Sequence, residues 1–263
     1  MKLRNFCVGR VQAVQINGET VNTAHVKRPS AEPWRITEQG AEGDERAVHP
    51  DKLYAFARTA YEYWGRQLRH DPAAWQDGFF GENLTVEDLD EEDIRVGDTF
   101  ALGDDVRLVV SGARTPCLKL AWRLGQPRTF QRVFAASRHT GVYFDVLVPG
   151  TVKRGDELRR LRHDPAMPSI AAICDFVQSS RPPPIEPLKM ALAFDRLSPV
   201  LRLLLSLKLE AAERAAALPV DHWPGWRPFV IDSIRDEAAD IRSFILKSAD
   251  GAPLSRPRAG QFV

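Results

Sequence analysis

The sequence has no long hydrophobic run, few cysteines and no excess of charge of either sign. Its most apolar stretch, at 200–207, is interrupted by Arg202 and Ser206 and falls well short of the roughly 18 residues that a membrane span needs. The N-terminus has no signal-peptide core or cleavage site, and the cysteines number three, an odd count. We therefore predict a cytoplasmic protein with neither a transmembrane helix nor a disulfide scaffold.

The charge balance narrows the classes of partner. Lys and Arg number 36 and Asp and Glu 35, which leaves a formal net charge of +1. A nearly neutral chain has no overall field that attracts nucleic acid or an anionic membrane, so we expect neither as a partner. With 263 residues, 44% hydrophobic and 27% charged, the composition is that of a folded globular protein of one or two domains.

Short alternating runs of apolar and polar residues dominate the first 165 residues. Asn17-Gly18 predicts a hairpin turn between runs at 8–16 and 20–26, and Gly103-Asp104-Asp105 predicts a second hairpin between 96–102 and 106–111. Helical spacing predicts helices at about 57–68 and 129–137. The fold class is therefore mostly β with some α, as a barrel or a sandwich over 1–165.

The pattern changes after residue 165. Helical periodicity, with Ser169 as a capping residue, predicts a small three-helix domain over 166–218. Residues 219–228, with two Trp and three Pro, are typical of a linker. A β pattern returns over 229–263, but two or three strands with open edges do not make a stable unit. We therefore expect an incomplete β segment at this end.

The most pointed local arrangement is Arg114-Thr115-Pro116-Cys117-Leu118-Lys119, directly after a predicted strand. Positive charge beside a thiol favours the thiolate, which is the form that attacks or binds a metal. The alternative is that Cys117 is a small buried apolar residue, as most free cysteines are. Cys7 and Cys174 lie in apolar segments and are expected in the core.

Three further segments contain candidate residues. The glycines in 40–52 let backbone amides approach an anion, although a solvated loop is an equal alternative. Glu82 and Asn83 can hydrogen-bond a ligand or cap a turn. The acidic run at 87–93 is expected to be a solvated face. No zinc signature, P-loop or dinucleotide fingerprint is present in the sequence.

Several short segments, in this order along the chain, carry a resemblance to a known family: Lys27-Arg28-Pro29, Gly40-Ala41-Glu42-Gly43-Asp44, His49-Pro50-Asp51-Lys52, Gly81-Glu82-Asn83-Leu84, Arg95-Val96-Gly97-Asp98, Arg114-Thr115-Pro116-Cys117-Leu118-Lys119, and Val148-Pro149-Gly150 ahead of Lys153-Arg154-Gly155-Asp156. Together they resemble the MOSC family, named for the C-terminal domain of molybdenum-cofactor sulfurase, and in particular its YiiM-like branch. The resemblance covers about residues 5–162, and the helical segment is similar to the three-helix domain that follows MOSC in that branch.

The resemblance implies a MOSC β-barrel that binds the molybdenum cofactor (molybdopterin) and reduces a small N-hydroxylated or N-oxide substrate. Cys117 corresponds to the metal-ligating and catalytic cysteine. The electrons would come from a flavin or iron–sulfur reductase. The cofactor-binding residues that it implies are Lys27, Gly43, Asp44, His49, Lys52, Glu82, Asn83, Arg114 and Lys119.

The last 37 residues or so resemble the opening strands of a ferredoxin-reductase-type flavin barrel. The Arg-x-Tyr-Ser/Thr element of such domains is absent, so we expect no FAD or NAD(P)H on this chain. The chain is then expected to be a severed fusion, with the reductase encoded beyond residue 263 or by another chain.

Two other functions stay open from the sequence. One is a carrier of the cofactor or of sulfur without turnover. The other is a cofactor-free binding module, because His49 runs directly into Pro50-Asp51-Lys52 where the family has two glycines.

Overall fold

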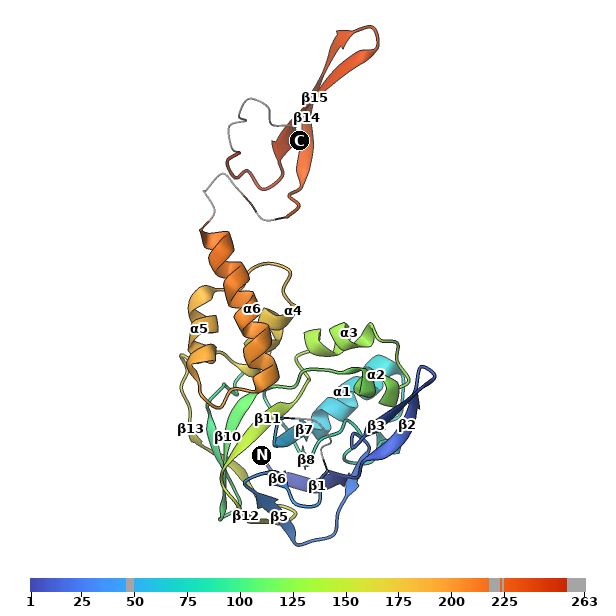
Figure 1. Cartoon of the computed structure of the whole chain (residues 1–263), viewed down its shortest axis with the longest axis vertical. Coiled ribbons are helices and arrows are strands. Elements are labelled where there is room, and N and C mark those ends of the chain that lie inside the picture. Colours follow the sequence, from blue (N-terminus) through green and yellow to red (C-terminus); the bar gives the residue numbers. More distant parts are fainter. Residues whose placement is uncertain (46–49, 218–222, 224, 255–263) are drawn as a thin grey trace. The chain divides into compact units, whose positions relative to one another are not determined.

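The computed structural model describes residues 1–45, 50–217, 223 and 225–254. The chain divides into two compact units, Met1–Leu209 and Glu210–Val263, which are described separately (Figure 1). No described helix has the length and apolar character that a membrane crossing requires.

The first unit is built on a mixed sheet of eight strands in the order β13-β9-β10-β11-β7-β8-β1-β4. Neighbouring strands of this sheet pair antiparallel, except that β7 and β8 pair parallel. All five residues of β7 are buried, as expected for a strand whose two faces are both covered. The strands are β1 (Leu3–Gly9), β4 (Lys27–Pro29), β7 (Leu53–Ala57), β8 (Leu84–Val86), β9 (Thr99–Leu102), β10 (Val106–Ala113), β11 (Val142–Val148) and β13 (Leu158–Arg162).

Among the described residues this sheet is open, so the predicted β-barrel is corrected to a barrel-like arrangement. Strands β13 and β4 are its two edges, and no ladder joins them among the described residues. The start of β1 nevertheless reaches the segment before β13 through an isolated bridge between Lys2 and Glu157. The backbone N–H of Leu3 donates to Asp156 O at 2.8 Å. One end of the sheet therefore bends back toward the other.

Smaller sheets complete the β structure. Strands β2 (Gln12–Ile16) and β3 (Glu19–Thr23) form the predicted hairpin, with Asn17 and Gly18 at φ 53° and 84° in its turn. The second predicted hairpin is confirmed as β9 and β10. Strands β5 (Trp34–Thr37), β6 (Gly40–Ala41) and β12 (Gly150–Val152) form a three-stranded sheet.

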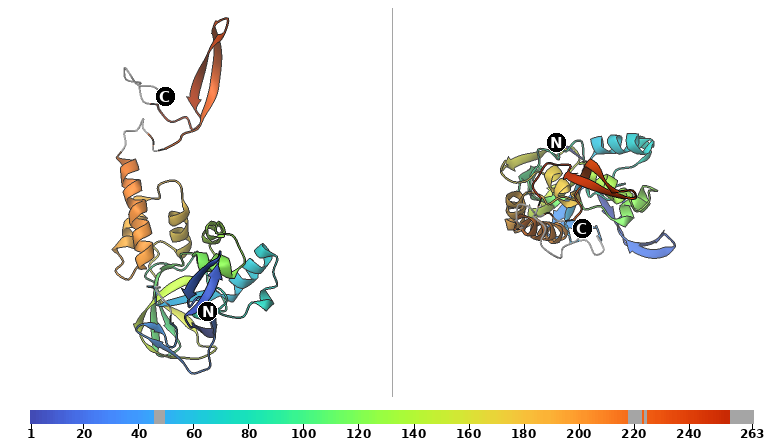
Figure 2. Two further views of the ribbon diagram at one scale, coloured as in Figure 1. Left: turned by 45° about the vertical axis from the view of Figure 1, so that its right-hand side comes forward. Right: turned by 90° about the horizontal axis from the view of Figure 1, so that it is seen from above.

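Helices α1 (Arg58–Leu68), α2 (Leu118–Arg123) and α3 (Phe130–Ala136) lie together beside the sheet (Figure 2). The predicted helices at 57–68 and 129–137 are confirmed as α1 and α3. Aromatic side chains join α1 and α3 to each other and to β7: Trp64 stacks on Phe134 at 5.0 Å between ring centroids, and Phe56 of β7 stacks on Phe134 at 6.4 Å. A short 3-10 helix, η1 (Pro72–Ala74), follows α1.

Three further helices follow the sheet: α4 (Ile170–Gln178), α5 (Ile185–Ala193) and α6 (Pro199–Ala216). The Oγ of Ser169 accepts the N–H of Ala172 at 3.1 Å, which confirms the predicted cap. The helices α4 and α5 and the part of α6 before Glu210 belong to the first unit. Gly112 in β10 permits the close approach of α6 to the sheet, because a Cβ at Gly112 would lie 2.2 Å from Leu201 Cδ1.

The acidic run at 87–93 is not uniformly a solvated face, so that prediction is wrong for Glu91. This side chain is only 6% exposed. It accepts hydrogen bonds from the backbone N–H and Oγ1 of Thr140, both at 3.0 Å, and from the N–H of Gly141 at 2.8 Å. A buried carboxylate is tolerated here because it accepts hydrogen bonds from donors of Thr140 and Gly141, just before β11 begins.

In the second unit, β14 (Phe229–Ala238) pairs antiparallel with β15 (Ile241–Ser248). Within the described residues neither strand has another partner. The two predicted strands are therefore present as a hairpin, and its assignment to a flavin barrel stays a prediction.

Candidate functional site

A cavity of about 160 Å³ lies in the first unit, where β7 and β11 approach the segments that follow β3 and β10. The lining residues are Thr23, Ala24, His25, Lys27, Asp51, Tyr54, Gly81, Asn83, Arg114, Cys117, Lys119 and Tyr143. The volume of the cavity is smaller than the roughly 300–1,000 Å³ of pockets that enclose whole drug-sized ligands. The enclosed space therefore suits a small anion or one end of a larger ligand.

Two tyrosines from neighbouring strands form part of the wall. Tyr54 on β7 is directly opposite Tyr143 on β11, and their rings lie 5.5 Å apart. The Tyr54 hydroxyl donates to Thr140 O at 2.7 Å. Burial raises the pKa of both phenols, although the Arg114 cation opposes this, so both stay protonated near neutral pH.

Arg114 is the most buried cation of the cavity. It follows the last residue of β10, is 5% exposed, and its guanidinium lies 4.7 Å from the centre of the Tyr54 ring. Burial lowers its pKa, but Tyr54, Tyr143 and Cys117 together raise it above the ordinary value, so it stays charged. Its Nε and Nη1 have no hydrogen-bond partner. Buried donors without partners are costly, and they indicate an acceptor that the site is built to receive.

His25 also contributes an unpartnered atom. It lies between β3 and β4, and its Nε2 is buried without a hydrogen-bond partner. Gly81 makes room for the ring, because a Cβ at Gly81 would lie 2.5 Å from His25 Cε1. Burial lowers the pKa of His25 well below its usual value, and the nearby cations Arg114 and Lys27 lower it further, so the imidazole is neutral at physiological pH.

Cys117 is partly exposed and comes immediately before α2, whereas Cys7 and Cys174 are buried. The two buried cysteines confirm the expectation that they belong to the core. Burial raises the pKa of both of them, that of Cys174 to about 12, which makes them poor nucleophiles. Cys117 is therefore the thiol that a ligand in the cavity can reach.

A buried clamp fixes the loop at 40–45 against the cavity wall. Lys27 Nζ forms an ion pair with Asp44, and both side chains are almost fully buried. Asp44 also accepts from the Gly9 backbone N–H at 2.7 Å and from Asn83 Nδ2 at 3.0 Å. The Asn83 Oδ1 accepts from the Tyr54 N–H at 3.2 Å. The polar atoms of this clamp bond to one another and hold Lys27 and Asn83 in place in the cavity wall.

The structure brings together five of the residues that the sequence indicated: Lys27, Asn83, Arg114, Cys117 and Lys119. Asp44 reaches the cavity through Lys27 and Asn83. Lys52 instead pairs with Asp145 at 2.6 Å, and Gly43 is exposed with open space around it. His49 lies outside the described residues.

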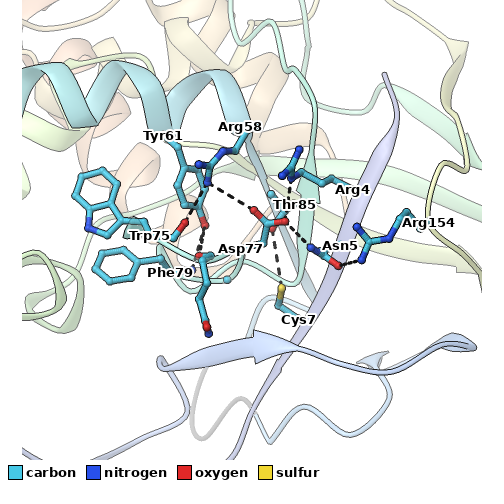
Figure 3. A network of polar contacts seen from close by, with 12 residues as sticks. Arg4, Asn5, Cys7, Arg58, Tyr61, Trp75, Asp77, Phe79, Thr85 and Arg154 are labelled. Atoms are coloured by element: carbon cyan, nitrogen blue, oxygen red, sulfur yellow. Dashed lines mark hydrogen bonds and ion pairs between the residues drawn. The ribbon is translucent and has the colours of Figure 1, made fainter. Parts of the chain in front are cut away.

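Glu82 is not among the residues that line the cavity; its carboxylate bonds Tyr61 and Thr85, which Figure 3 shows, and its Oε2 is buried without a hydrogen-bond partner. Its Oε1 accepts from the Tyr61 hydroxyl at 2.5 Å, from the Gly78 N–H at 2.8 Å and from Thr85 Oγ1 at 2.8 Å. Burial raises its pKa, while the hydrogen bonds from Tyr61 and Gly78 lower it. Glu82 thus holds the 78–82 turn against α1, one residue before the side chain of Asn83 that faces the cavity.

Asp77 is a second buried carboxylate, and its network of polar contacts is shown in Figure 3. Its Oδ2 accepts from Asn5 Nδ2 at 2.5 Å and from Arg4 Nε at 3.1 Å, and its Oδ1 lies 3.6 Å from Arg58 Nη1. Arg58 also donates to Trp75 O at 3.1 Å. These contacts tie β1, α1 and the segment after η1 to one another.

Sequence reasoning missed His25, Tyr54 and Tyr143 as cavity residues. The sequence predicts strands at 20–26 and 141–148, which contain His25 and Tyr143, but it predicts no strand at Tyr54. In none of the three cases does it reveal which neighbour the side chain will face. A signal existed for His25 alone, since it lies two residues before Lys27, and alternate residues of an extended segment share a face.

Comparison with known proteins places this arrangement in a class. The MOSC domain matches residues 42–159. The chain is 33% identical over 160 residues to YflK, an uncharacterised protein of Bacillus subtilis, and the match covers 59% of this chain and 70% of YflK. It is 34% identical over 123 residues to YiiM of Escherichia coli, covering 44% of this chain and 54% of YiiM.

A longer relative carries a functional name. A Gibberella moniliformis protein named Reductase is 32% identical over 158 residues, which cover 58% of this chain and 28% of that protein. The chain therefore spans about half of YiiM and less than a third of the fungal protein.

Solved structures agree with the fold. YiiM of Geobacillus stearothermophilus superposes with a TM-score of 0.64 at 25% identity, covering 79% of this chain and 98% of that one. YiiM of Escherichia coli superposes with a TM-score of 0.60 at 20% identity, covering 80% and 94%.

The fold and the site thus define a mixed α/β protein with a thiol and cations around a small cavity. The chain belongs to the MOSC domain family. MOSC domains are associated with the molybdenum cofactor, and the residues present fit such a ligand: an accessible thiol for the metal and unpartnered Arg114 donors for an anionic group.

Proposed function

We propose that the chain is a molybdenum-cofactor-binding oxidoreductase module that reduces N-hydroxylated or N-oxide compounds. The observation that carries the proposal is the meeting of the accessible Cys117 thiol with the buried, unpartnered donors of Arg114 in one cavity. A soft thiolate suits a sulfur-rich metal centre, and guanidinium and ammonium groups suit a phosphate. The fungal relative named Reductase supports a redox function.

The reaction is a two-electron reduction. For a hydroxylamine, two electrons and two protons break the N–O bond and yield the amine and one water molecule. The cofactor, when bound, supplies a metal that passes these electrons to the substrate. A flavin or iron–sulfur reductase is the proposed electron source, supplied by another chain or a further domain.

In this proposal each residue of the cavity has a separate role in binding the cofactor or the substrate. In this proposal Cys117 binds the metal, while Arg114 and Lys119 hold anionic groups of the cofactor. The Lys27–Asp44 clamp keeps the wall in place. His25, neutral and with a free Nε2, is positioned to hydrogen-bond a ligand in the cavity. Tyr54 and Tyr143 stay protonated and close one side against water.

The first test is the molybdenum content of protein purified from molybdenum-replete cells. We expect Cys117→Ser to lose the bound molybdenum, because a hydroxyl is a poor ligand for a soft metal centre. The matched control is Cys174→Ser, which alters a buried cysteine away from the cavity lining and should retain the metal. Full retention of molybdenum by Cys117→Ser would overturn the assignment.

The second test separates an enzyme from a carrier. The metal-loaded protein is given a chemical reductant and a hydroxylaminopurine, and the aminopurine product is measured. Product formed at many turnovers per metal supports the oxidoreductase. Bound cofactor without product supports a carrier, and protein without molybdenum or pterin supports a cofactor-free binding module.

A further inference from the structure

One segment of the first unit is strongly one-sided in charge. Residues 106–144 contain seven Lys and Arg residues and no Asp or Glu, in a chain whose net charge is only +1. The seven are Arg107, Arg114, Lys119, Arg123, Arg128, Arg132 and Arg138. This segment includes Cys117 and the helices α2 and α3, which contact each other (Figure 2).

Most of these cations have no acidic partner. Arg138 pairs with Glu92 and Asp175, both at 2.7 Å. Among the described residues no ion pair is formed by Lys119, Arg123, Arg128 or Arg132, and Arg128 and Arg132 are exposed.

Two of the unpaired cations, Lys119 and Arg123, lie at or near the cavity. Lys119 lines it, and both Lys119 and Arg123 are close enough to His25 to lower its pKa. Arg123 lies over the Phe79 ring at 4.4 Å, and its buried Nε has no hydrogen-bond partner. Burial lowers the pKa of Arg123, and the positive charge of the exposed Arg28 on β4 lowers it further.

We propose that Arg28, Arg123, Arg128 and Arg132, here called the basic rim, are the docking surface for an acidic electron-donor protein. Like charges held together without counterions repel one another, and an acidic partner relieves that repulsion. The surface adjoins the cavity that contains Cys117, so a donor bound there delivers electrons beside the proposed metal. The inference rests on the proposed function.

An acidic protein fits the observations better than a nucleic acid does. Acidic residues elsewhere cancel the charge of the rim in the sum over the chain, so the attraction is local rather than global. Electron delivery is also the need that the proposed reaction creates.

The test uses a reduced acidic flavodoxin as the probe. Its oxidation by the metal-loaded protein is followed by stopped flow at low and high ionic strength. The double variant Arg28→Glu/Arg128→Glu reverses two exposed charges of the rim. The control Arg159→Glu/Arg162→Glu makes the same change in net charge on β13, at two exposed residues without ion pairs among the described residues.

We expect the rim variant to react at least about tenfold more slowly at low salt, and the control within about twofold of the unaltered chain. High salt should remove the difference. Equal slowing in both variants, or no slowing in the rim variant, would overturn the proposal. Tighter binding to a short DNA duplex than to flavodoxin, lost in the rim variant alone, would also overturn it in favour of nucleic acid.

Failure of the docking surface is distinguishable from failure of the function. Turnover with a chemical reductant but no effect of rim reversal on flavodoxin rejects the surface and leaves the function standing. Flavodoxin binding to the metal-free chain, measured by titration and lost in the rim variant, supports the surface even where no molybdenum is found.

Discussion

Two polar regions of the first unit, the network around Asp77 and the cavity beside Cys117, differ in how far their polar atoms are hydrogen-bonded. They are adjacent along the chain at Glu82 and Asn83. In the network around Asp77 (Figure 3) and the neighbouring Glu82, side chains and backbone groups hydrogen-bond one another, and the one buried atom left without a partner among the residues named is Glu82 Oε2. The cavity leaves buried atoms of Arg114 and His25 without partners. The first arrangement stabilises a fold, whereas the second costs stability and is typical of a ligand site.

The largest effect on stability is expected from breaking the network around Asp77. Asp77→Asn leaves Arg58 and Arg4 without their anionic partner, so the free energy of unfolding should fall by about 2–3 kcal/mol in urea denaturation. Asp93→Asn is the control, because Asp93 is half-exposed and pairs with Arg160 at the surface. A loss of at most about 1 kcal/mol is expected there. Equal losses in the two variants would contradict the contrast.

A pH titration sharpens the comparison with a third buried carboxylate. Burial raises the pKa of Glu91 to about 7, although hydrogen bonds from Thr140 and Gly141 oppose this. The folded state therefore binds the proton more tightly than the unfolded state, so this contribution is fully present below about pH 4.5 and is lost as pH rises through 7.

From pH 5 to 8 the stability should fall by about 2 kcal/mol more in the unaltered chain than in Glu91→Gln. Glu92→Gln, which changes an exposed neighbour, should keep the slope of the unaltered chain. Identical slopes in all three proteins would show that Glu91 does not titrate in this range.

The smallest effect on stability is expected in the cavity. Arg114→Met removes a buried cation whose donors are unpartnered, so the free energy of unfolding should change by less than about 1 kcal/mol or even rise. Molybdenum retention should nevertheless fall at least about tenfold, because the anionic part of the ligand loses its guanidinium. A loss of stability as large as that of Asp77→Asn would place Arg114 in the structural network instead.

The sequence predicted the parts of the fold that depend on local chemistry. Asn17-Gly18 has the backbone freedom of a tight hairpin, and Ser169 has a side chain that caps a helix, so both features could be located in advance. The parallel pairing of β7 with β8 and the open edges of the sheet depend on contacts between distant segments, which alternation does not encode.

The same limit applies to the site. Five residues that the resemblance names as a site line one cavity: Lys27, Asn83, Arg114, Cys117 and Lys119. That they bind a cofactor stays a prediction. The motifs did not reveal that Glu82 is not among the lining residues, because its direction depends on Tyr61 and Gly78.

Native mass spectrometry of the intact protein from molybdenum-replete cells tests the central claim most directly. We predict a mass increment of one molybdenum-bearing pterin cofactor per chain, present in the unaltered protein and absent from Cys117→Ser. An unaltered chain at its bare polypeptide mass, or an increment that persists in Cys117→Ser, would contradict the claim that this cavity holds the cofactor through Cys117.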